Sequence, residues 1–131
     1  MTQTIFVPEI VNMPAVYTSI DRDGMTLASV FLIDWAFEMF DSGDLVEVIE
    51  VRDLHVKPSE RGNGFLRSLM DYSLNNYADR PIMLRVESFD HGMPTSDLIA
   101  WYQRLGFEFD CPFMDGDDWL WRRPVGEASN L

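Results

Sequence analysis

The sequence is poor in the residues that build disulfide frameworks and metal sites. Its 131 residues hold one cysteine, Cys111, and two histidines, and these three lie far apart. A single cysteine excludes an internal disulfide and fits a reducing compartment, so we expect a cytoplasmic protein. The cysteine and histidine spacings typical of zinc sites are missing as well. We therefore expect neither a structural nor a catalytic metal.

Long apolar runs are also missing. No stretch approaches the roughly 20 apolar residues that a helix needs to span a bilayer. The first residues of the sequence do not show the basic and then apolar layout of a signal peptide. We therefore expect no membrane segment.

Positive charge is scarce, with ten Lys and Arg against 22 Asp and Glu and a formal net charge of −12. Such a protein repels nucleic acid and anionic membranes, so we expect neither as a partner. The imbalance is uneven, because residues 1–60 carry eleven acidic and three basic residues, whereas residues 61–131 carry eleven and seven. The second half is thus the better place for a phosphate-bearing ligand, and the first half would attract a cation. The acidity also serves to keep a small protein soluble.

Short apolar segments separated by turn residues fill most of the chain. The apolar residues in 25–40 alternate as in a strand, and Leu27, Val30, Phe31 and Trp35 would also suit a helix, but the turn residues on both sides favour a long strand. We predict helices from Leu66 to Tyr77 and from Thr95 or Ser96 to Leu105, and strands at 5–7, 16–20, 25–40, 45–56, 81–87, 107–111 and 119–123. This order predicts an α+β fold with a mixed, largely antiparallel sheet and flanking helices. We expect one domain over residues 1–124 and a disordered polar tail over 125–131.

The most informative segment is the turn Arg61-Gly62-Asn63-Gly64, which joins the 45–56 strand to the following helix. Glycines let the backbone turn tightly and bring successive N–H groups to one point, and the positive end of the helix dipole reinforces that point. The turn therefore predicts an anion site, most often for phosphate. It lacks the Gly-Lys-Ser/Thr ending of a nucleoside-triphosphate loop and the G-x-G-x-x-G spacing of dinucleotide folds.

Two motifs carry a resemblance to a known family. The first is Val56-x-Pro58-x-x-Arg61-Gly62-x-Gly64, followed by Leu69-Met70. It resembles the pyrophosphate-binding segment of the GNAT superfamily of acyl-CoA-dependent N-acetyltransferases, which usually reads Q/R-x-x-G-x-G/A. Arg61 and Gly64 fill its first and fourth places, and Leu66 stands where a small residue is expected. The second is Trp101-Tyr102-Gln103-Arg104-Leu105-Gly106-Phe107, similar to the family's tyrosine-bearing helix closed by Leu-Gly-Phe. The resemblance covers residues 16–123.

The resemblance implies a GNAT-like sheet with a central splayed pair of parallel strands, here 45–56 and 81–87, between which acetyl-CoA binds as co-substrate. Backbone groups of the first strand would pair with the pantetheine arm, and amides of the glycine turn would hold the pyrophosphate. The implied cofactor-binding residues are Leu54, His55, Val56, Arg61, Gly62, Asn63, Gly64, Phe65 and Leu66.

The resemblance also implies catalytic roles. Tyr102 occupies the family's usual place of the general acid, which protonates the departing thiolate. Glu50, eleven residues before Arg61, resembles the glutamate base of the histone-acetylating branch. Many members rely on water, so the alternatives for the base are water and four further side chains: Glu47, Asp53, His55 and His91.

Two departures from the family bear on the acceptor. Between Val7 and Val16 there is almost no room for the helix pair that walls the acceptor site in the family. An open site favours a lysine or N-terminus of a protein, or a site completed by a second subunit as in a homodimer. The alternative is a small amine, a polyamine or an aminoglycoside, which the acidic first half would attract. The second departure lies in the second helix, where Thr95 and Leu98 replace the usual asparagine and small residue.

A set of large apolar side chains points to a different class of function. The set exceeds what a core of this size requires, and we expect about half of it to form an interface for a partner protein or a second copy. Its members are Trp35, Phe37, Met39, Phe40, Trp119 and Trp121. A catalytically inactive GNAT-like module that binds a protein partner is therefore the main alternative to an enzyme.

Overall fold

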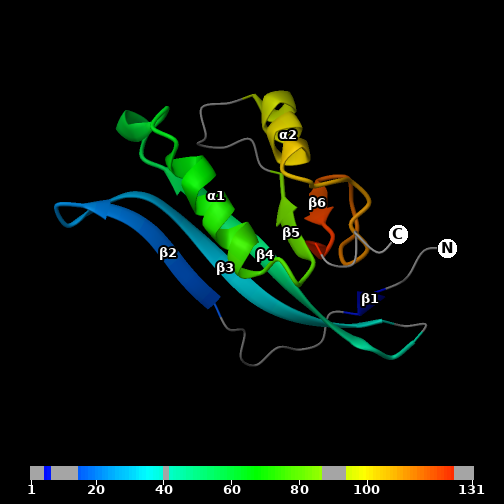
Figure 1. Cartoon of the computed structure of the whole chain (residues 1–131). Coiled ribbons are helices and arrows are strands. Elements are labelled where there is room, and N and C mark those ends of the chain that lie inside the picture. Colours follow the sequence, from blue (N-terminus) through cyan, green and yellow to red (C-terminus); the bar gives the residue numbers. More distant parts are fainter. Residues whose placement is uncertain (1–4, 7–14, 40–41, 87–93, 126–131) are drawn as a thin grey trace.

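The structure is a computed structural model of the chain, and it describes residues 5–6, 15–39, 42–86 and 94–125 (Figure 1). The elements follow one another as β1 (Ile5–Phe6), β2 (Ala15–Arg22), β3 (Met25–Met39), β4 (Leu45–Val56), the 3-10 helix η1 (Pro58–Glu60), α1 (Phe65–Asn76), β5 (Ile82–Arg85), α2 (Thr95–Arg104) and β6 (Trp119–Arg122). Among the described residues, no helix is both long enough and apolar enough to cross a membrane.

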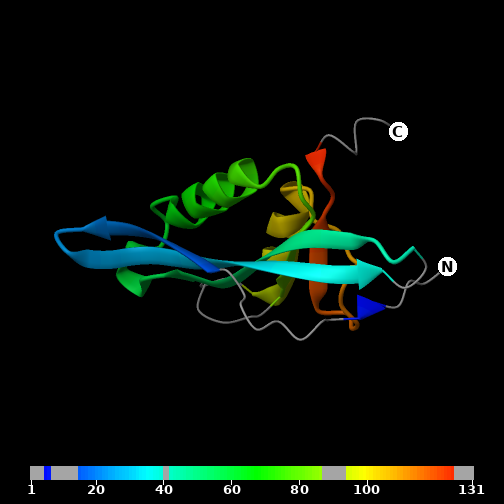
Figure 2. The ribbon, with the colours of Figure 1, turned by 90° about the horizontal axis from the view of Figure 1, so that it is seen from below.

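The described strands form one six-stranded sheet in which β3 is the longest member. One edge of β3 pairs with β4, and the other edge pairs with β1 and β2 in succession. Figure 2 shows β3 and β4 as long, twisted strands that run the length of the molecule. All pairings are antiparallel except the one between β4 and β5. The predicted α+β fold, with a largely antiparallel sheet and a central parallel pair, is therefore confirmed.

The β2–β3 hairpin turns at Asp23-Gly24, where φ is 53° and 78°. Positive φ at both turn residues gives the twist that suits a two-residue hairpin, and the sequence Asp-Gly favours it. The long-strand interpretation of 25–40 is correct, since β3 extends from Met25 to Met39. The strand over 45–56 has the predicted bounds.

The predicted strand at 107–111 is wrong. Within this segment only Glu108 makes a bridge, to Trp121, and the bridge is isolated. The alternating pattern does not become a strand because Asp110 has φ of 63°, which ends the extended backbone. Phe107 packs in the core that holds both helices, whereas Cys111 packs in the second core.

The predicted cap of the second helix is also wrong. Thr95 and Ser96 lie inside α2, and its N-cap is Pro94, which has no side chain that can accept a hydrogen bond. Proline suits this place because its extended backbone (φ −60°, ψ 152°) leads into the helix. Asp97 lies in the first turn, where the helix dipole favours a carboxylate.

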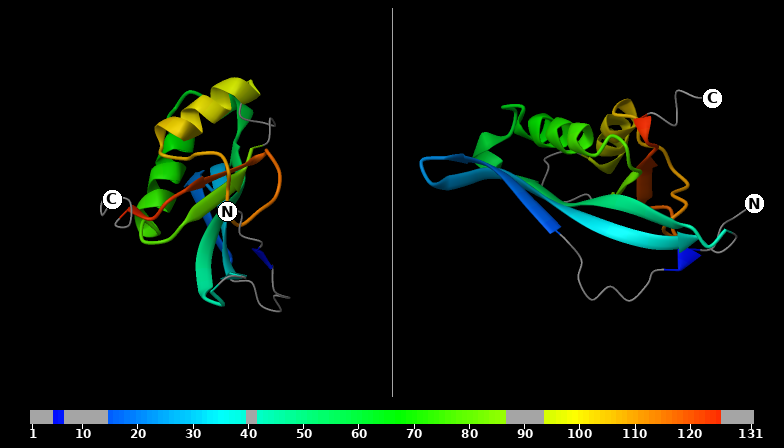
Figure 3. Two further views of the ribbon diagram at one scale, coloured as in Figure 1. Left: turned by 90° about the vertical axis from the view of Figure 1, so that its right-hand side faces the viewer. Right: turned by 60° about the horizontal axis from the view of Figure 1, so that its bottom comes forward.

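Apolar side chains fill both faces of the sheet. The helix-face core joins α1 and α2 to the sheet, and both helices lie on the same side (Figure 3). Residues Leu69, Met70 and Leu74 of α1 and Leu98 of α2 contribute to it. The helix predicted from Leu66 to Tyr77 is confirmed as α1, with bounds one residue earlier.

The second core lies on the opposite face, between the sheet and the segment 111–114. Five of the six large residues expected to supply an interface belong to it: Trp35, Phe37, Met39, Trp119 and Trp121. Phe37 and Met39 are buried, and the tryptophans pack partly buried against them. These five residues belong to a core. The expectation that about half of the six would form an interface is therefore wrong. Phe40 lies outside the described residues.

Several further predictions fall outside the described residues. They concern the connection 7–14, in which the family's helix pair has no room, and the candidate base His91. The end of the strand predicted over 81–87 and the tail 126–131 also lie outside. Val125 is described, and its N–H donates to the carbonyl of Ala78 at 2.9 Å.

Cys111 provides a test of the second core. The residue is 8% exposed, and burial raises the pKa of its thiol. Because the thiolate is the reactive form, we expect a disulfide reagent such as DTNB to modify Cys111 slowly in the native protein and rapidly after unfolding in guanidinium chloride. Rapid modification of the native protein at neutral pH would show that the segment 111–114 does not protect the thiol.

Candidate cofactor and active site

The strands β4 and β5 run side by side and then part. Their pairing ends at Val51 and Leu84. Beyond this point β4 stays paired with β3 as far as Val56, while β5 stays paired with β6 through Arg85. The two strands thus follow different neighbours, and their facing backbone edges no longer pair. We call the stretch beyond Val51 and Leu84 the β4–β5 opening.

A bulge in β4 lies at the start of this opening. The register between β3 and β4 shifts by one residue between the pair Phe31–Arg52 and the pair Ser29–His55. Asp53 has φ of 53°, the backbone expected where one strand holds an extra residue. The consecutive polar residues Arg52-Asp53, which break the alternation of the strand, are the sequence signal of this bulge.

The bulge decides which backbone groups face the opening. The N–H of Lys57 donates to the carbonyl of Leu27 at 2.7 Å, so Lys57 faces β3, as His55 does through its pairing. Since backbone groups alternate along a strand, the N–H and C=O groups of Leu54 and Val56 face the opening. Their side chains are buried in the helix-face core, which fixes the backbone in place.

The loop that follows β4 and η1 turns into α1. Gly62 and Gly64 have φ of 88° and 81°, a backbone region that glycine adopts without strain. A Cβ on either glycine would meet nothing within 4 Å, so the space beside both is open. The glycines are therefore required by the backbone turn and not by crowding.

The N-terminus of α1 is free of capping side chains. Its N-cap, Gly64, makes no side-chain hydrogen bond, and the first turn of the helix holds no acidic residue. The first N–H groups of a helix have no partner within the helix. Those of Phe65 and Leu66 are therefore placed to donate to an anion, and the helix dipole adds to the attraction. Both side chains pack against the helix-face core, so Leu66 points along the buried face of α1.

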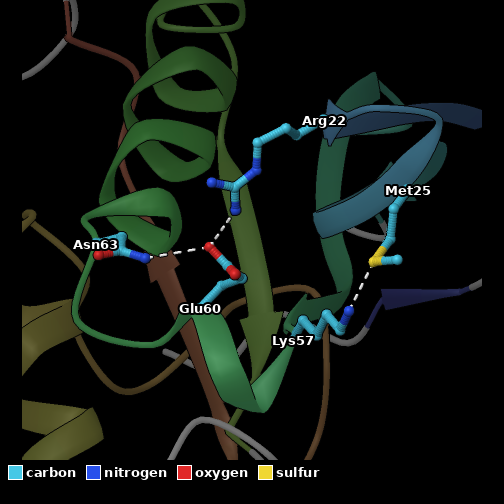
Figure 4. Close-up of polar contacts among 5 residues, drawn as sticks. All are labelled: Arg22, Met25, Lys57, Glu60 and Asn63. Carbon is cyan, nitrogen blue, oxygen red and sulfur yellow. Dashed lines mark hydrogen bonds and ion pairs between the residues drawn. The ribbon is translucent and has the colours of Figure 1, made fainter.

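A polar network ties the β2–β3 hairpin to this loop (Figure 4). One nitrogen of Arg22 lies 2.6 Å from Oε1 of Glu60, and the amide of Asn63 donates to the same oxygen at 3.2 Å. Beside it, the ammonium of Lys57 contacts the sulfur of Met25 at 2.6 Å. The sequence prediction did not include Arg22 or Glu60. The Asp-Gly turn predicts the hairpin, but no local signal indicates where its end comes to lie.

Glu50 lies one residue before the pairing of β4 and β5 ends. It faces the side of the sheet opposite the helices and is 4% exposed. Its Oε1 accepts from Nε1 of Trp35 and from Nη2 of Arg52, both at 2.8 Å. Its Oε2 accepts from Nε of Arg52 at 3.0 Å. Each carboxylate oxygen can accept about two hydrogen bonds, so Oε2 retains one acceptor position.

Tyr102 lies on the other side of the sheet, in the helix-face core, and is 4% exposed. Its ring centroid is 5.9 Å from that of Phe107 and 5.3 Å from that of Trp101. Gly106, with φ of 98°, lets the N–H of Phe107 return to the carbonyl of Tyr102 at 3.2 Å. The Leu-Gly-Phe motif thus ends α2 and holds the tyrosine ring. Glu50 and Tyr102 lie on opposite faces, and the β4–β5 opening is where the two faces meet.

The other predicted site residues are less closely grouped. Glu47 precedes the parallel pairing and lies 3.9 Å from Arg80, at the far end of β4 from the opening. Asp53 is exposed on the bulge, and His55 is partly buried on the same strand. In α2, Leu98 is fully buried and Thr95 is exposed at the first position. The described residues include no group of three or more side chains that could hold a metal ion.

An ion pair flanks the opening on the β6 side. Arg85 donates to Asp118 at 2.7 Å, and this hydrogen bond lowers the pKa of the Asp118 carboxyl. A carboxyl whose pKa is lowered in the folded state stabilises the fold at a pH above its ordinary pKa. This contribution is lost as the pH falls through the pKa of the folded state. Both side chains are about half exposed, at 57% and 44%, so the contribution is small.

We therefore expect Asp118→Asn to lower Tm by about 1–4 °C at pH 7 and to leave it unchanged at a pH well below about 3. Thermal unfolding followed by circular dichroism across this pH range measures the difference. An equal loss of Tm at both pH values would show that the carboxylate charge contributes nothing.

Comparison with solved structures identifies the architecture. The Bacillus subtilis N-acetyltransferase YlbP, in complex with coenzyme A, matches with a TM-score of 0.58 at 18% identity, over 82% of this chain and 67% of that one. A mutant AtaT toxin, bound to the C-terminus of the antitoxin AtaR and acetyl-CoA, matches with a TM-score of 0.61 at 13% identity, over 91% and 72%. An acyl-CoA N-acyltransferase from Pseudomonas aeruginosa matches with a TM-score of 0.51 at 20% identity, over 82% and 68%.

This chain has the GNAT fold. It spans 67–72% of the lengths of these three GNAT-fold chains, two of which hold coenzyme A or acetyl-CoA. No family model matches the sequence, and the search of curated proteins gives no match. At identities of 13–20%, the likeness is one of fold.

Proposed function

We propose that this GNAT-fold chain is an N-acetyltransferase that moves an acetyl group from acetyl-CoA to a primary amine of a protein. The observation that carries the proposal is the uncapped, glycine-led N-terminus of α1 at the end of the strand that lines the β4–β5 opening. This arrangement offers donors for a pyrophosphate and, among the described residues, a backbone edge without a strand partner for the arm attached to it. Coenzyme-bound structures of the same fold support it.

The proposed cofactor contacts come from consecutive segments of the chain. The amides of residues 62–66 bind the pyrophosphate, and Arg61 adds a charge-assisted contact. The backbone groups of Leu54 and Val56 pair with the amide groups of the pantetheine arm, as an added strand would. The acetyl thioester then lies near the start of the opening, between the faces that carry Glu50 and Tyr102.

The proposed chemistry is direct attack of the amine on the thioester carbonyl. The amine nitrogen forms a bond to the acetyl carbon, and the carbon–sulfur bond breaks. Tyr102 donates the proton that the departing thiolate takes up, and the amine loses a proton to the base. The products are an amide and coenzyme A. Because a neutral amine is the nucleophile, the rate depends on removing a proton from an ammonium ion.

Glu50 is the proposed base. The remaining acceptor position on its Oε2 can take that proton directly or through a water, while Trp35 and Arg52 hold the carboxylate in place. We expect Glu50→Gln to lower kcat by about 10²-fold with little change in coenzyme affinity. The competing base on the same strand is His55, and His55→Gln is the matched variant.

Steady-state rates against pH distinguish the two bases. Loss of rate in Glu50→Gln with an unchanged profile in His55→Gln supports Glu50. A pH–rate profile whose acidic limb disappears in His55→Gln assigns the base to the histidine.

A protein amine is the proposed acceptor because exposed side chains of the described residues lie near Glu50 on its face of the sheet. Arg52 is 44% exposed there, and the neighbouring aromatic pair Tyr17 and Phe31 is 52% and 37% exposed. The centroids of the two rings lie 4.9 Å apart, and the rings, tilted by 51°, form an exposed apolar patch next to Arg52. Such a surface suits a polypeptide chain better than a small amine enclosed in a pocket.

The acceptor class is testable by turnover. The protein is incubated with acetyl-CoA and a library of lysine and N-terminal peptides, with polyamines and aminoglycosides in parallel, and acetylated products are read by mass spectrometry. The chain holds one lysine, Lys57, so self-acetylation is confined to that residue and the N-terminus. Acetylated peptides support the proposal, and products from small amines alone contradict it. Binding of acetyl-CoA without any product indicates the non-catalytic partner-binding module.

A further inference from the structure

We propose that Arg22, at the end of β2, is a phosphate-binding residue of the coenzyme site, and that Glu60 is the residue that positions it there. The inference rests on the proposed function, because the phosphate belongs to coenzyme A. Arg22 lies outside both motifs and 38 residues before its partner. The hairpin, and not the glycine loop alone, then forms one side of the coenzyme site.

The contacts place Arg22 beside the loop. Oε1 of Glu60 accepts from Arg22 at 2.6 Å and from Asn63 at 3.2 Å. Asn63 stands between the two glycines whose backbone turns into α1. Figure 4 shows the guanidinium of Arg22, from the hairpin, and the amide of Asn63, at the start of α1, both directed at one oxygen of Glu60. One carboxylate oxygen thus joins the hairpin end to the anion-binding turn.

Arg22 keeps donors for a ligand. Its side chain is 57% exposed, whereas that of Glu60 is 18% exposed. A guanidinium has five N–H donors in a planar fork, and the bond to Glu60 engages one nitrogen. The rest of the fork faces solvent beside the loop, and such a fork suits the paired oxygens of a phosphate.

The distribution of charge supports the same assignment. Residues 1–60 hold three basic residues, and Figure 4 shows two of them, Arg22 and Lys57, near the loop that leads into α1. Lys57 contacts Met25 and lies apart from the network of Arg22, Glu60 and Asn63. Two of the three cations of this acidic half thus lie near the glycine turn that begins at Arg61.

Glu60 makes the proposal sharply testable. By charge alone, a carboxylate beside a phosphate site opposes binding, so its removal should strengthen the affinity for coenzyme A. If Glu60 instead holds Arg22 and Asn63 in place, its removal weakens the affinity. The sign of the change therefore separates positioning from simple electrostatics.

The test is titration calorimetry of the full chain with coenzyme A and with dephospho-CoA. We expect Arg22→Gln to weaken the binding of coenzyme A about tenfold, as for the loss of one charge-assisted contact. We expect Glu60→Gln to weaken it about three- to tenfold, although a negative charge is removed. The control is Arg67→Gln, an exposed arginine of α1 paired with Asp71, which should change the affinity less than about twofold.

The two ligands identify the phosphate. If Arg22 binds the 3′-phosphate, Arg22→Gln binds dephospho-CoA as tightly as the native protein does. If Arg22 binds the pyrophosphate, the substitution weakens the binding of coenzyme A and of dephospho-CoA by the same factor. Either result supports the proposal. Native-like affinity of Arg22→Gln for coenzyme A, or tighter binding by Glu60→Gln, overturns it. Failure of the native chain to bind coenzyme A overturns the proposed function as well, so the two failures are distinguishable. Unchanged Tm values exclude unfolding of the variants.

Discussion

Gly64→Trp is expected to weaken the binding of coenzyme A by about 100-fold or more. The residue has φ of 81° and ends the loop at the first N–H groups of α1, so an indole there occupies the open space beside those donors. It also strains a backbone turn that glycine adopts freely. The loss of several hydrogen bonds to a pyrophosphate, each about 1 kcal/mol or more, accounts for the factor. Titration calorimetry measures it.

The chain offers a matched control in Gly43. Gly43 has φ of 72°, meets nothing within 4 Å of an added Cβ, and lies in the turn between β3 and β4. Gly43→Trp carries the same strain and the same added side chain without touching the proposed site. We expect it to bind coenzyme A as the native chain does. If both variants lose binding equally, the effect of Gly64→Trp is one of stability, and the loop has no special role.

Tyr102→Phe is expected to lower kcat by about 10²-fold or more while the affinity for acetyl-CoA stays within about twofold. The ring remains packed against Phe107 and Trp101 in the helix-face core, so the change removes only the hydroxyl. A general acid acts on the departing thiolate and not on the bound coenzyme. The loss therefore belongs in kcat and not in binding, and steady-state kinetics with calorimetry separate the two.

Tyr77→Phe is the control for this variant. Tyr77 follows the C-terminus of α1 and contacts the guanidinium of Arg80, at the end of the helix away from the glycine loop. Removal of its hydroxyl should leave kcat unchanged. A native rate in Tyr102→Phe would remove the tyrosine from the chemistry and assign protonation of the thiolate to water.

Local patterns in the sequence were sufficient to predict most of the helices and strands. The Asp-Gly turn, the alternation of 45–56 and the spacing of leucines after Gly64 each predict one element, because their causes lie within a few neighbouring residues. The strand predicted at 107–111 is wrong because alternation does not reveal the left-handed backbone of Asp110. The consecutive polar residues Arg52-Asp53 indicate the bulge at Asp53. Alternation alone does not predict that the bulge shifts the register of β4 against β3.

The candidate site was predictable to the extent that its parts are contiguous. The glycine turn and the N-terminus of α1 follow from one stretch of sequence. The partners of Glu50 and Glu60 do not, because Trp35 lies 15 residues from Glu50 and Arg22 lies 38 residues from Glu60. Such contacts depend on strand register and on the path of a hairpin, which a single sequence does not specify.

The proposed function requires this chain to bind coenzyme A at the glycine turn of α1. The most direct test is titration calorimetry of the native protein with coenzyme A, at low salt and with the fold confirmed by circular dichroism. We expect saturable binding in the micromolar range, with one molecule bound per chain. A folded protein that gives no binding heat at millimolar coenzyme A would rule out the proposed coenzyme site.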